Sequence, residues 1–524
     1  MSSSFSGHFS LSWLAHRVHL QQRVSSSCTR CIRTFQHQQR REASSASAST
    51  SASSHDGKVH KHHHHPSSDS GNATTQTFHT RNGKVKIDLS NRSLIGVHQS
   101  RGERAYQEDT FAVQAIDVDG DECRRALSSG DSSSSSSLAG SPTAKPRGEE
   151  GSTGNDQSSS STGDSDSQNV EQSLYCAVFD GHNGSQVSQF LSSHLHNRLL
   201  SVKQSEANAI VSNYRALGGY MRRYKGGLLS GMVEPPAPRR MKRIERELKV
   251  DEERRAREDR GEIEPSSRNN EEVSTTSQDE KSAKPAKEYP PWNLLQRLEA
   301  GFLKTDLEII ETEKDAGSTA TVALLHSLDT PRNPFFASEE LHLILAHCGD
   351  TRAILCTLPH GVAVRLTETH HPEARTETDR LMRIRTGAVT DSFGESRWAG
   401  SLANTRAFGD AHYKALGVFS EPQLISQVIK GSENAFLILL SDGVTEVLSD
   451  QEICDLSSRG YTNPAHAARN VISFAESVGA QDNLTCIIVP LQGWGKVKGA
   501  DGTLKRRELR VANYEGRSNR QNRM

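Results

Sequence analysis

Residues 174–184 read Leu-Tyr-Cys-Ala-Val-Phe-Asp-Gly-His-Asn-Gly and are the most informative segment of the chain. The first six residues are apolar or aromatic and lie between a serine-rich segment and a glycine-containing turn, so they predict a buried strand. Asp180 then stands where the strand ends. A carboxylate followed by the unobstructed carbonyl of Gly181 and by an imidazole suits an oxygen-ligated cation. By itself this segment also fits a polar turn after a core strand, so its meaning depends on the other acids.

The composition predicts a folded domain interrupted by polar segments. Only 33% of the 524 residues are hydrophobic and 5% are aromatic, which is too polar for one continuous globule of this length. The polar residues are localised, so we expect one core of about 250–300 residues with disordered insertions. The net charge of −1 gives no indication of a nucleic-acid or anionic-membrane partner. No apolar run approaches the roughly 18 residues of a transmembrane helix.

The N-terminal region resembles a targeting segment. Residues 1–41 contain six arginines and no acid, which is typical of a mitochondrial presequence, although an ordinary basic tail is the alternative. We therefore expect a mitochondrial protein of the matrix or the intermembrane space. The predicted divisions after it are a disordered Ser/His-rich linker at 42–84, a folded domain at 85–493 with disordered insertions at about 128–172 and 233–288, and a basic tail at 494–524.

Local patterns predict several elements of the core. Apolar residues at helical spacing predict helices at about 187–199 and 294–309, and alternation predicts a strand at 111–118. Asp117, Asp119 and Asp121 imitate a calcium-binding loop, but its twelfth position is Ser128 rather than Glu. A hairpin turn is the better interpretation there. The eight cysteines show no spacing typical of a disulfide scaffold.

Acidic side chains recur near the ends of predicted strands. Glu108 and Asp109 lie in a turn, Asp442 follows a strand and Asp482 precedes one. Such acids are candidates to converge at one sheet edge, where carboxylates share a small volume only if cations neutralise them. All-oxygen ligation favours magnesium or manganese over zinc. Two such ions about 3.5–4 Å apart would activate a water for attack on a phosphoryl group, and Arg104 would clamp the phosphate oxygens.

Motifs occur in a specific order between residues 94 and 490. They are Arg104-x-x-x-Glu108-Asp109, Val178-Phe179-Asp180-Gly181-His182-x-Gly184, Gly317-Ser318-Thr319-Ala320, Cys348-Gly349-Asp350-Thr351-Arg352, His370-His371-Pro372 with Glu377 and Arg380, Gly400-Ser401-Leu402-Ala403-x-x-Arg406-Ala407-x-Gly409-Asp410, Ser441-Asp442-Gly443 and Asp482-Asn483. Each motif is modest, but their joint order is similar to that of the metal-dependent serine/threonine protein phosphatases of type 2C, including fungal mitochondrial members.

The resemblance implies an α+β fold, a four-layer αββα sandwich of two antiparallel β-sheets flanked by antiparallel helices. It also implies hydrolysis of phosphoserine and phosphothreonine in protein substrates at a binuclear magnesium or manganese site at one end of the sandwich. In that site Asp180 would bridge both ions, Gly181 would offer its carbonyl, and Asp442 and Asp482 would hold the second ion. The pair Glu108–Asp109 would act close by, partly through water.

The remaining roles come from the same resemblance. Arg104 would bind phosphate and His182 would protonate the leaving seryl or threonyl oxygen. Asp350 matches a position linked with a weaker third ion, and Glu446 stands where the family usually has Asp, which places the affinity for that ion in question. His371 replaces the common Lys before a proline, with an effect expected near the cleft. Neither departure removes a primary ligand, so an inactive phosphatase is disfavoured.

Other classes need features that this chain does not show. A haloacid-dehalogenase-type phosphatase would have Asp in place of His182, and a kinase would need a phosphate-cradling glycine loop and a catalytic-loop Asp. The alternative that stays open is a catalytically weak or inactive scaffold that recruits partners through its insertions. The pyruvate dehydrogenase complex is a candidate partner by analogy only.

Overall fold

The computed structural model describes residues 74–80, 83–130, 170–236, 289–381, 388–390, 396–459 and 463–521. The predicted presequence at 1–41, most of the predicted linker and most of both predicted insertions lie outside these residues. Within the described residues, no helix combines the length and the apolar character needed to cross a membrane.

Two five-stranded sheets form the centre of the fold, and every pairing between neighbouring strands is antiparallel. The first sheet has the order β15 (Gln423–Lys430), β9 (Glu340–Cys348), β8 (Ala320–Ser327), β5 (Val170–Phe179) and β4 (Thr110–Asp119). The second sheet has the order β11 (Val362–Arg365), β10 (Arg352–Thr357), β16 (Asn434–Leu440), β17 (Leu484–Pro490) and β3 (Gly96–Ser100).

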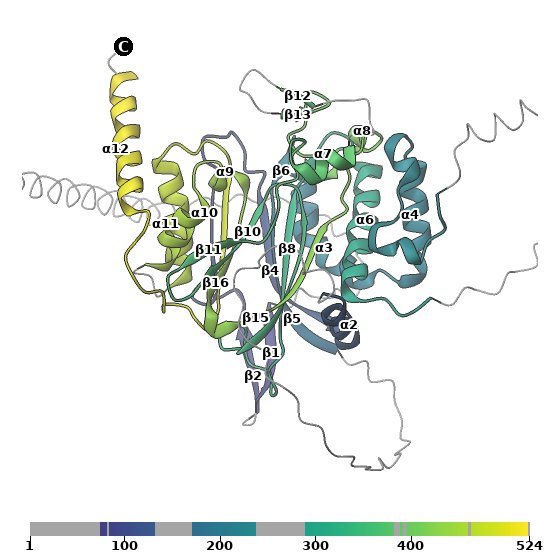
Figure 1. Cartoon of the computed structure of the whole chain (residues 1–524), viewed down its shortest axis with the longest axis horizontal. Coiled ribbons are helices and arrows are strands. Elements are labelled where there is room, and N and C mark those ends of the chain that lie inside the picture. Colours follow the sequence, from purple (N-terminus) through teal and green to yellow (C-terminus); the bar gives the residue numbers. More distant parts are fainter. Residues whose placement is uncertain are drawn as a thin grey trace, which may run out of the picture. The chain divides into compact units, whose positions relative to one another are not determined.

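Helices cover the outer face of each sheet (Figure 1). Those on the side of the first sheet are α2 (Gly120–Gly130), α3 (Gln186–Ser201), α4 (Ala207–Ala216) and α6 (Leu294–Thr312). Those on the side of the second sheet are α9 (Asp442–Thr445), α10 (Asp450–Ser458), α11 (Pro464–Ser477) and α12 (Leu504–Gln521). The predicted helices at 187–199 and 294–309 are confirmed as α3 and α6.

Short elements complete the described structure. They are the hairpin β1 (Thr75–Thr80) and β2 (Gly83–Asp88), the three-stranded sheet of β14 (Phe408–Gly409), β7 (Gly317–Ser318) and β6 (Gly181–His182), the hairpin β12 (Ala388–Thr390) and β13 (Ser396–Trp398), the helices α7 (Arg375–Leu381) and α8 (Ala411–Lys414), and four 3₁₀ turns at Gln204–Glu206, Gly219–Arg223, Gly227–Gly231 and Gly431–Glu433.

Strand β5 shows why the sandwich has four layers. Successive side chains of a strand point to opposite faces, so one alternate set of β5 faces the helices and the other faces the second sheet. Tyr175 and Phe179 pack in the core with α3 and α6, whereas Leu174 and Val178 pack in the core between the sheets. Both faces are buried, which explains the uninterrupted apolar run of the sequence. A third core separates the second sheet from α10 and α11, and the predicted αββα architecture is confirmed.

Three local predictions were wrong. The segment after Asp119 is the helix α2 rather than a hairpin turn, because Asp119 Oδ1 accepts hydrogen bonds from the backbone N–H groups of Asp121 and Glu122 at 2.8 and 3.2 Å. Cys123 and Ala126 then bury one face of the helix. Likewise β-structure begins at Thr75, inside the range 42–84 predicted as disordered, because the hairpin β1–β2 buries Phe78 and Ile87 in the core between the sheets.

The third correction concerns the C-terminal segment, where 494–524 was predicted to be a basic tail. It contains α12, whose mainly polar sequence offers little apolar stripe. Ion pairs attach this helix to α10 instead, since Arg506 and Arg510 both contact the buried carboxylate of Glu452. A search for hydrophobic periodicity cannot detect a helix held in this way.

Candidate metal centre

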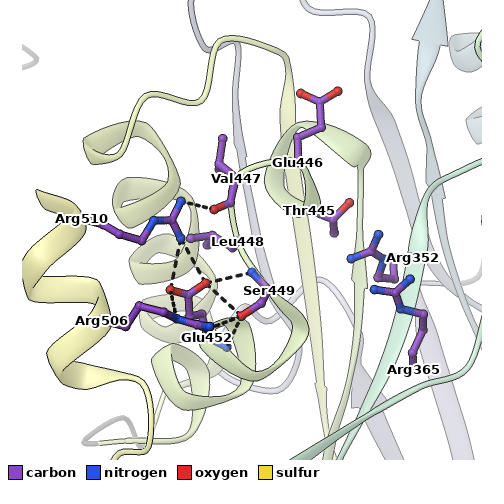
Figure 2. A pocket seen from close by; sticks show the side chains of 10 residues that line it. All are labelled: Arg352, Arg365, Thr445, Glu446, Val447, Leu448, Ser449, Glu452, Arg506 and Arg510. Carbon is purple, nitrogen blue, oxygen red and sulfur yellow. Dashed lines mark hydrogen bonds and ion pairs between the residues drawn. The ribbon is translucent and has the colours of Figure 1, made fainter. Parts of the chain in front are cut away.

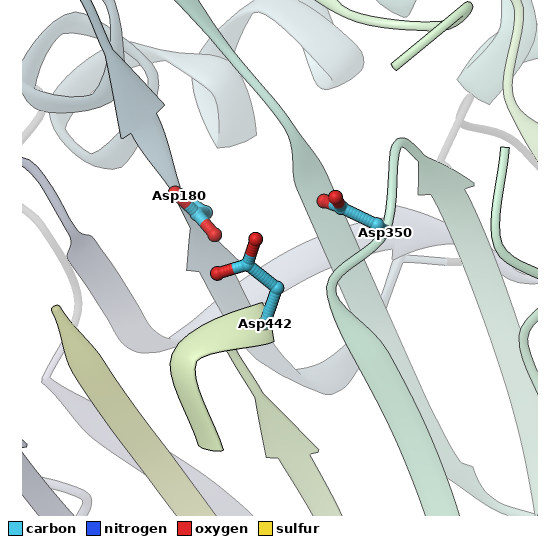
Figure 3. A group of neighbouring side chains, drawn as sticks. All are labelled: Asp180, Asp350 and Asp442. Atoms are coloured by element: carbon cyan, nitrogen blue, oxygen red, sulfur yellow. The ribbon is translucent and has the colours of Figure 1, made fainter. Parts of the chain in front are cut away.

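Three carboxylates converge at one end of the two sheets (Figure 3). Asp180 directly follows β5 of the first sheet, and Asp442 begins α9 immediately after β16 of the second sheet. Asp350 lies in the turn that carries the chain from β9 to β10, and so from one sheet to the other. One carboxylate oxygen of each residue lies within 4.8 Å of the others. The convergence predicted for Asp180 and Asp442 is present, and Asp350 joins them.

The acids of this group repel one another when they are ionised. Burial raises the pKa of Asp180 well above its ordinary value, and the neighbouring carboxylates of Asp442 and Asp109 raise it further. Burial also raises the pKa of Asp442, to which Asp350 adds repulsion. The pKa of Asp109 rises to about 6, again chiefly through burial. Acids that cannot share the site as anions are suited to a bound cation.

Asp350 behaves differently because it has an imidazole partner. Burial would raise its pKa, but Nε2 of His371 lies 3.2 Å from Asp350 Oδ2 and lowers it. The effect of His371 therefore reaches the acidic group itself, which the sequence did not indicate. Within the described residues, Oδ1 of Asp350 and Oδ1 of Asp109 are buried without a hydrogen-bond partner. Buried acceptors of this kind are costly unless something else binds them, and a divalent cation meets that need.

The pair Glu108–Asp109 joins the start of β4 to its neighbours. Glu108 Oε1 accepts from the backbone N–H of Gly184 at 2.6 Å, and Asp109 Oδ2 accepts from Thr485 Oγ1 at 2.7 Å. A Cβ atom on Gly181 would lie 2.6 Å from the carbonyl oxygen of Glu108, so only glycine lets these two segments approach so closely. Both acids are thereby held beside the segment that carries Asp180.

Asp482 lies outside the group of three and is paired with Arg104. Arg104 Nη2 donates to Asp482 Oδ2 at 2.5 Å, and 55% of the Arg104 side chain is exposed. The charge of Asp482 still contributes to the raised pKa values of Asp109 and Asp442. The structure therefore places the predicted phosphate ligand and a predicted metal ligand in contact with each other.

Glu446 is near Asp442 but does not join the acidic group. It caps the C-terminal end of α9, where its backbone N–H donates to the carbonyl of Asp442 at 2.8 Å. Its charge raises the pKa of Asp442. Asp350 is grouped with Asp180 and Asp442 rather than with Glu446, so the two residues predicted for a third ion are not brought together within that group.

His182 pairs with a buried acid that the sequence did not assign, and 28% of the His182 side chain is exposed. Its Nε2 lies 3.0 and 2.9 Å from the two carboxylate oxygens of Asp410, which is 1% exposed. Burial would lower the pKa of His182, but the hydrogen bond and charge of Asp410 raise it. The three-stranded sheet β14–β7–β6 places the two residues together, since β6 ends at His182 and β14 ends just before Asp410. In the sequence, the feature that pointed to Asp410 was its place at the end of the motif that begins at Gly400.

This chain is similar to known protein phosphatases. The protein phosphatase 2C family model matches residues 262–484. Protein phosphatase 2C homolog 4 of Schizosaccharomyces pombe is 33% identical over 339 residues, covering 63% of this chain and 74% of the relative. Protein phosphatase 1K, mitochondrial, of Xenopus laevis is 34% identical over 185 residues, covering 35% of this chain and 46% of the relative. A solved serine-threonine phosphatase 2C from Toxoplasma gondii has 16% identity, a TM-score of 0.41 and coverage of 76% and 94%.

The family match and the sandwich of two antiparallel sheets place this chain among the metal-dependent protein phosphatases. This chain belongs to the protein phosphatase 2C family and is a protein serine/threonine phosphatase. Its family is metal dependent, with magnesium or manganese as the cofactor.

Proposed function

We propose that the chain removes phosphate from phosphoserine and phosphothreonine in mitochondrial proteins, with two magnesium or manganese ions at the candidate centre. The observation that supports this most directly is the group Asp180, Asp350 and Asp442, in which one carboxylate oxygen of each residue lies within 4.8 Å of the others. Burial and neighbouring acids raise the pKa of Asp180 and of Asp442. The proposed ligands are Glu108, Asp109, Asp180, the carbonyl of Gly181, Asp442 and Asp482, with Asp350 and Glu446 as candidates for a weaker third ion.

When bound, the ions would supply an activated water and would neutralise charge on the phosphoryl oxygens. Arg104 would exchange its ion pair with Asp482 for two of those oxygens, because a guanidinium fork binds phosphate bidentately. The exposure of Arg104 allows this exchange without unpacking the core.

His182 would protonate the oxygen that leaves phosphorus. Nε2 is occupied by Asp410, so Nδ1 is the ring nitrogen left to carry the transferred proton. The raised pKa of His182 favours the protonated ring that a general acid needs. As the P–O bond breaks, the proton would pass from Nδ1 to the seryl oxygen, and Asp410 would hold the ring in place.

Phosphate release from a phosphoserine peptide tests the proposal directly. The purified full chain should turn over the peptide with added manganese or magnesium and should stop when EDTA is added. Folded protein that releases no phosphate with either ion would favour the alternative, a scaffold that recruits partners through its insertions. Circular dichroism on the same sample distinguishes an inactive protein from an unfolded one.

Mitochondrial residence rests on two observations. Residues 1–41 contain six arginines and no acid, and one relative is named as mitochondrial. A fusion of residues 1–41 to a fluorescent protein should enter mitochondria, whereas a diffuse cytosolic signal would contradict the assignment. Phosphoproteomics of mitochondria with and without the chain would then identify substrates, with the pyruvate dehydrogenase complex as one candidate by analogy.

A further inference from the structure

A second polar pocket, of about 480 Å³, lies between α12 and the second sheet (Figure 2). Four arginines line it from two sides: Arg352 on β10 and Arg365 on β11, and across from them Arg506 and Arg510 on α12. The hydroxyl-bearing residues Thr445 and Ser449 also line it, together with the acids Glu446 and Glu452. The four arginines and the two hydroxyl-bearing residues have no role in the proposed catalytic chemistry.

The arginines of this pocket outnumber the carboxylates that contact them. Asp450 accepts from Arg352 Nη1 and from Arg365 Nε, both at 2.8 Å, so one carboxylate serves two guanidinium groups. Glu452 likewise serves the two arginines of α12, Arg506 and Arg510, each at 3.1 Å. Four positive charges against two negative charges leave an excess of two.

Glu446 also lines the pocket, and counting it still leaves four positive charges against three negative ones. Its carboxylate points away from the four arginines in Figure 2. The arginine side of the pocket therefore keeps a local positive excess.

One carboxylate, that of Asp450, holds the guanidinium groups of Arg352 and Arg365 close together. The positions of Arg506 and Arg510 are explained by the attachment of α12 to α10, because both arginines bind Glu452. That attachment does not explain why Arg352 and Arg365 share one carboxylate beside the same cavity. A bound anion would relieve their repulsion.

We propose that this pocket binds a phosphoryl group, presented either as orthophosphate or as a second phosphoserine of a protein substrate. Guanidinium forks match the tetrahedral oxygens of phosphate, and hydroxyl groups add further donors. The pocket also adjoins the candidate metal centre, because α9 begins with Asp442 and ends at Thr445. An anion held here would lie at the far end of the same short helix.

Calorimetry with orthophosphate tests the pocket without relying on catalysis. The full chain is titrated in the presence of magnesium at constant ionic strength. The pocket variant, Arg365→Gln with Arg506→Gln, changes two side chains that are 45% and 55% exposed. A matched control, Arg124→Gln with Arg198→Gln, removes the same charge from side chains 55% and 41% exposed on α2 and α3, in the layer of the first sheet.

We expect the wild type and the control to bind orthophosphate at a site that the pocket variant loses or binds at least about tenfold more weakly. Identical isotherms for the pocket variant and the control would overturn the proposal. Arg365→Gln alone serves as the second variant if the double variant unfolds, since Arg365 Nε donates to Asp450 and the ion pairs that attach α12 stay in place. Failure of the proposed function is a separate result, namely absent turnover with this site intact.

Peptides distinguish the two sources of the phosphoryl group. With EDTA present to prevent hydrolysis, a doubly phosphorylated peptide is compared with its singly phosphorylated counterpart. Tighter binding of the doubly phosphorylated peptide by the wild type and the control, but not by the pocket variant, identifies the substrate as the source. Equal binding of both peptides, together with loss of the orthophosphate site in the pocket variant, identifies free orthophosphate. If neither ligand distinguishes the pocket variant from the control, the pocket is not a phosphate site.

Discussion

Two groups of acids in this molecule lie in opposite electrostatic settings. Glu377 of α7 is fully buried, and Arg380 and Arg406 bind its two oxygens at 2.5 and 2.7 Å. Burial would raise its pKa, but the two arginines lower it to about 2. In the candidate metal centre, burial and neighbouring acids raise the pKa of Asp180 and Asp442 instead. The chain's own arginines neutralise Glu377, whereas the acids of the candidate metal centre depend on a bound cation for the same effect.

This difference separates structural acids from acids available to a ligand. A carboxylate neutralised by the chain itself stabilises the fold, and removing it leaves buried cations behind. Carboxylates that repel one another reduce stability until a cation binds, so removing one has the opposite effect on the metal-free protein. Substitutions in the two regions should therefore change activity and stability in different proportions.

The largest effect is expected from removing a proposed metal ligand. Asp442→Asn and Asp482→Asn should each reduce manganese-dependent phosphopeptide turnover below detection, because each removes a carboxylate ligand. In EDTA the melting temperature of Asp442→Asn should equal or exceed that of the wild type, since the repulsion between Asp442 and Asp350 is relieved. Calorimetry should show weaker manganese binding. Unchanged binding and turnover would remove these residues from the set of ligands.

The next largest effect concerns His182 and depends on the leaving group. A seryl alkoxide needs a proton as it departs, whereas p-nitrophenolate is stable without one. His182→Ala should lose roughly 10²–10⁴-fold in turnover of a phosphoserine peptide, the usual contribution of such proton transfer. It should lose far less with p-nitrophenyl phosphate. Equal losses on both substrates, with weaker metal binding in parallel, would falsify the acid role and leave His182 as a structural partner of Asp410.

Glu377→Gln should affect stability rather than chemistry. Breaking a buried ion pair from one side typically costs about 3–5 kcal/mol, and here Arg380 and Arg406 would lose their shared anion. Denaturant unfolding at neutral pH measures the loss. Glu433→Gln, at an exposed pair with Lys430, is the control and should change stability by less than about 0.5 kcal/mol. A small effect for Glu377→Gln would show that the two regions differ less than their pKa values indicate.

The lowered pKa of Glu377 predicts how the stabilisation by this residue depends on pH. The folded-state pKa of Glu377 is about 2 and lies below its ordinary value of 4.5, so the unfolded chain binds the proton more readily. The stabilisation is therefore complete above the ordinary value and is lost as pH falls from about 4.5 toward 2. The stability difference between wild type and Glu377→Gln should narrow across that range.

The smallest effect is expected from shortening the polar segments between the motifs. Replacing residues 131–169 or 237–288 with short Gly/Ser linkers should leave metal-dependent turnover within a few fold, because their composition offers few core-forming residues. The structure narrows these limits from the predicted 128–172 and 233–288, since α2 extends to Gly130 and β5 begins at Val170. Complete loss of activity in a folded variant would mean that a segment contributes to the site.

The sequence by itself determined the fold family and several of the principal strands and helices, and it predicted the acids of the candidate metal centre. Alternation and helical spacing report local burial, and β5 is a clear case because its apolar run is packed on both faces. The same signal was insufficient for α12, where Arg506 and Arg510 bind Glu452 with little help from an apolar stripe. The metal roles of the acids stay predictions until they are measured.

Only the tertiary structure decided which of these residues meet. His182 and Asp410 are 228 residues apart, and the pairing of β6 and β14 with β7 brings them within hydrogen-bond distance. Asp350 likewise joins Asp180 and Asp442 because one turn connects the two sheets at the edge where the others end. Local sequence patterns carry the periodicity of a single element, whereas proximity between distant elements depends on how the sheets pair and stack.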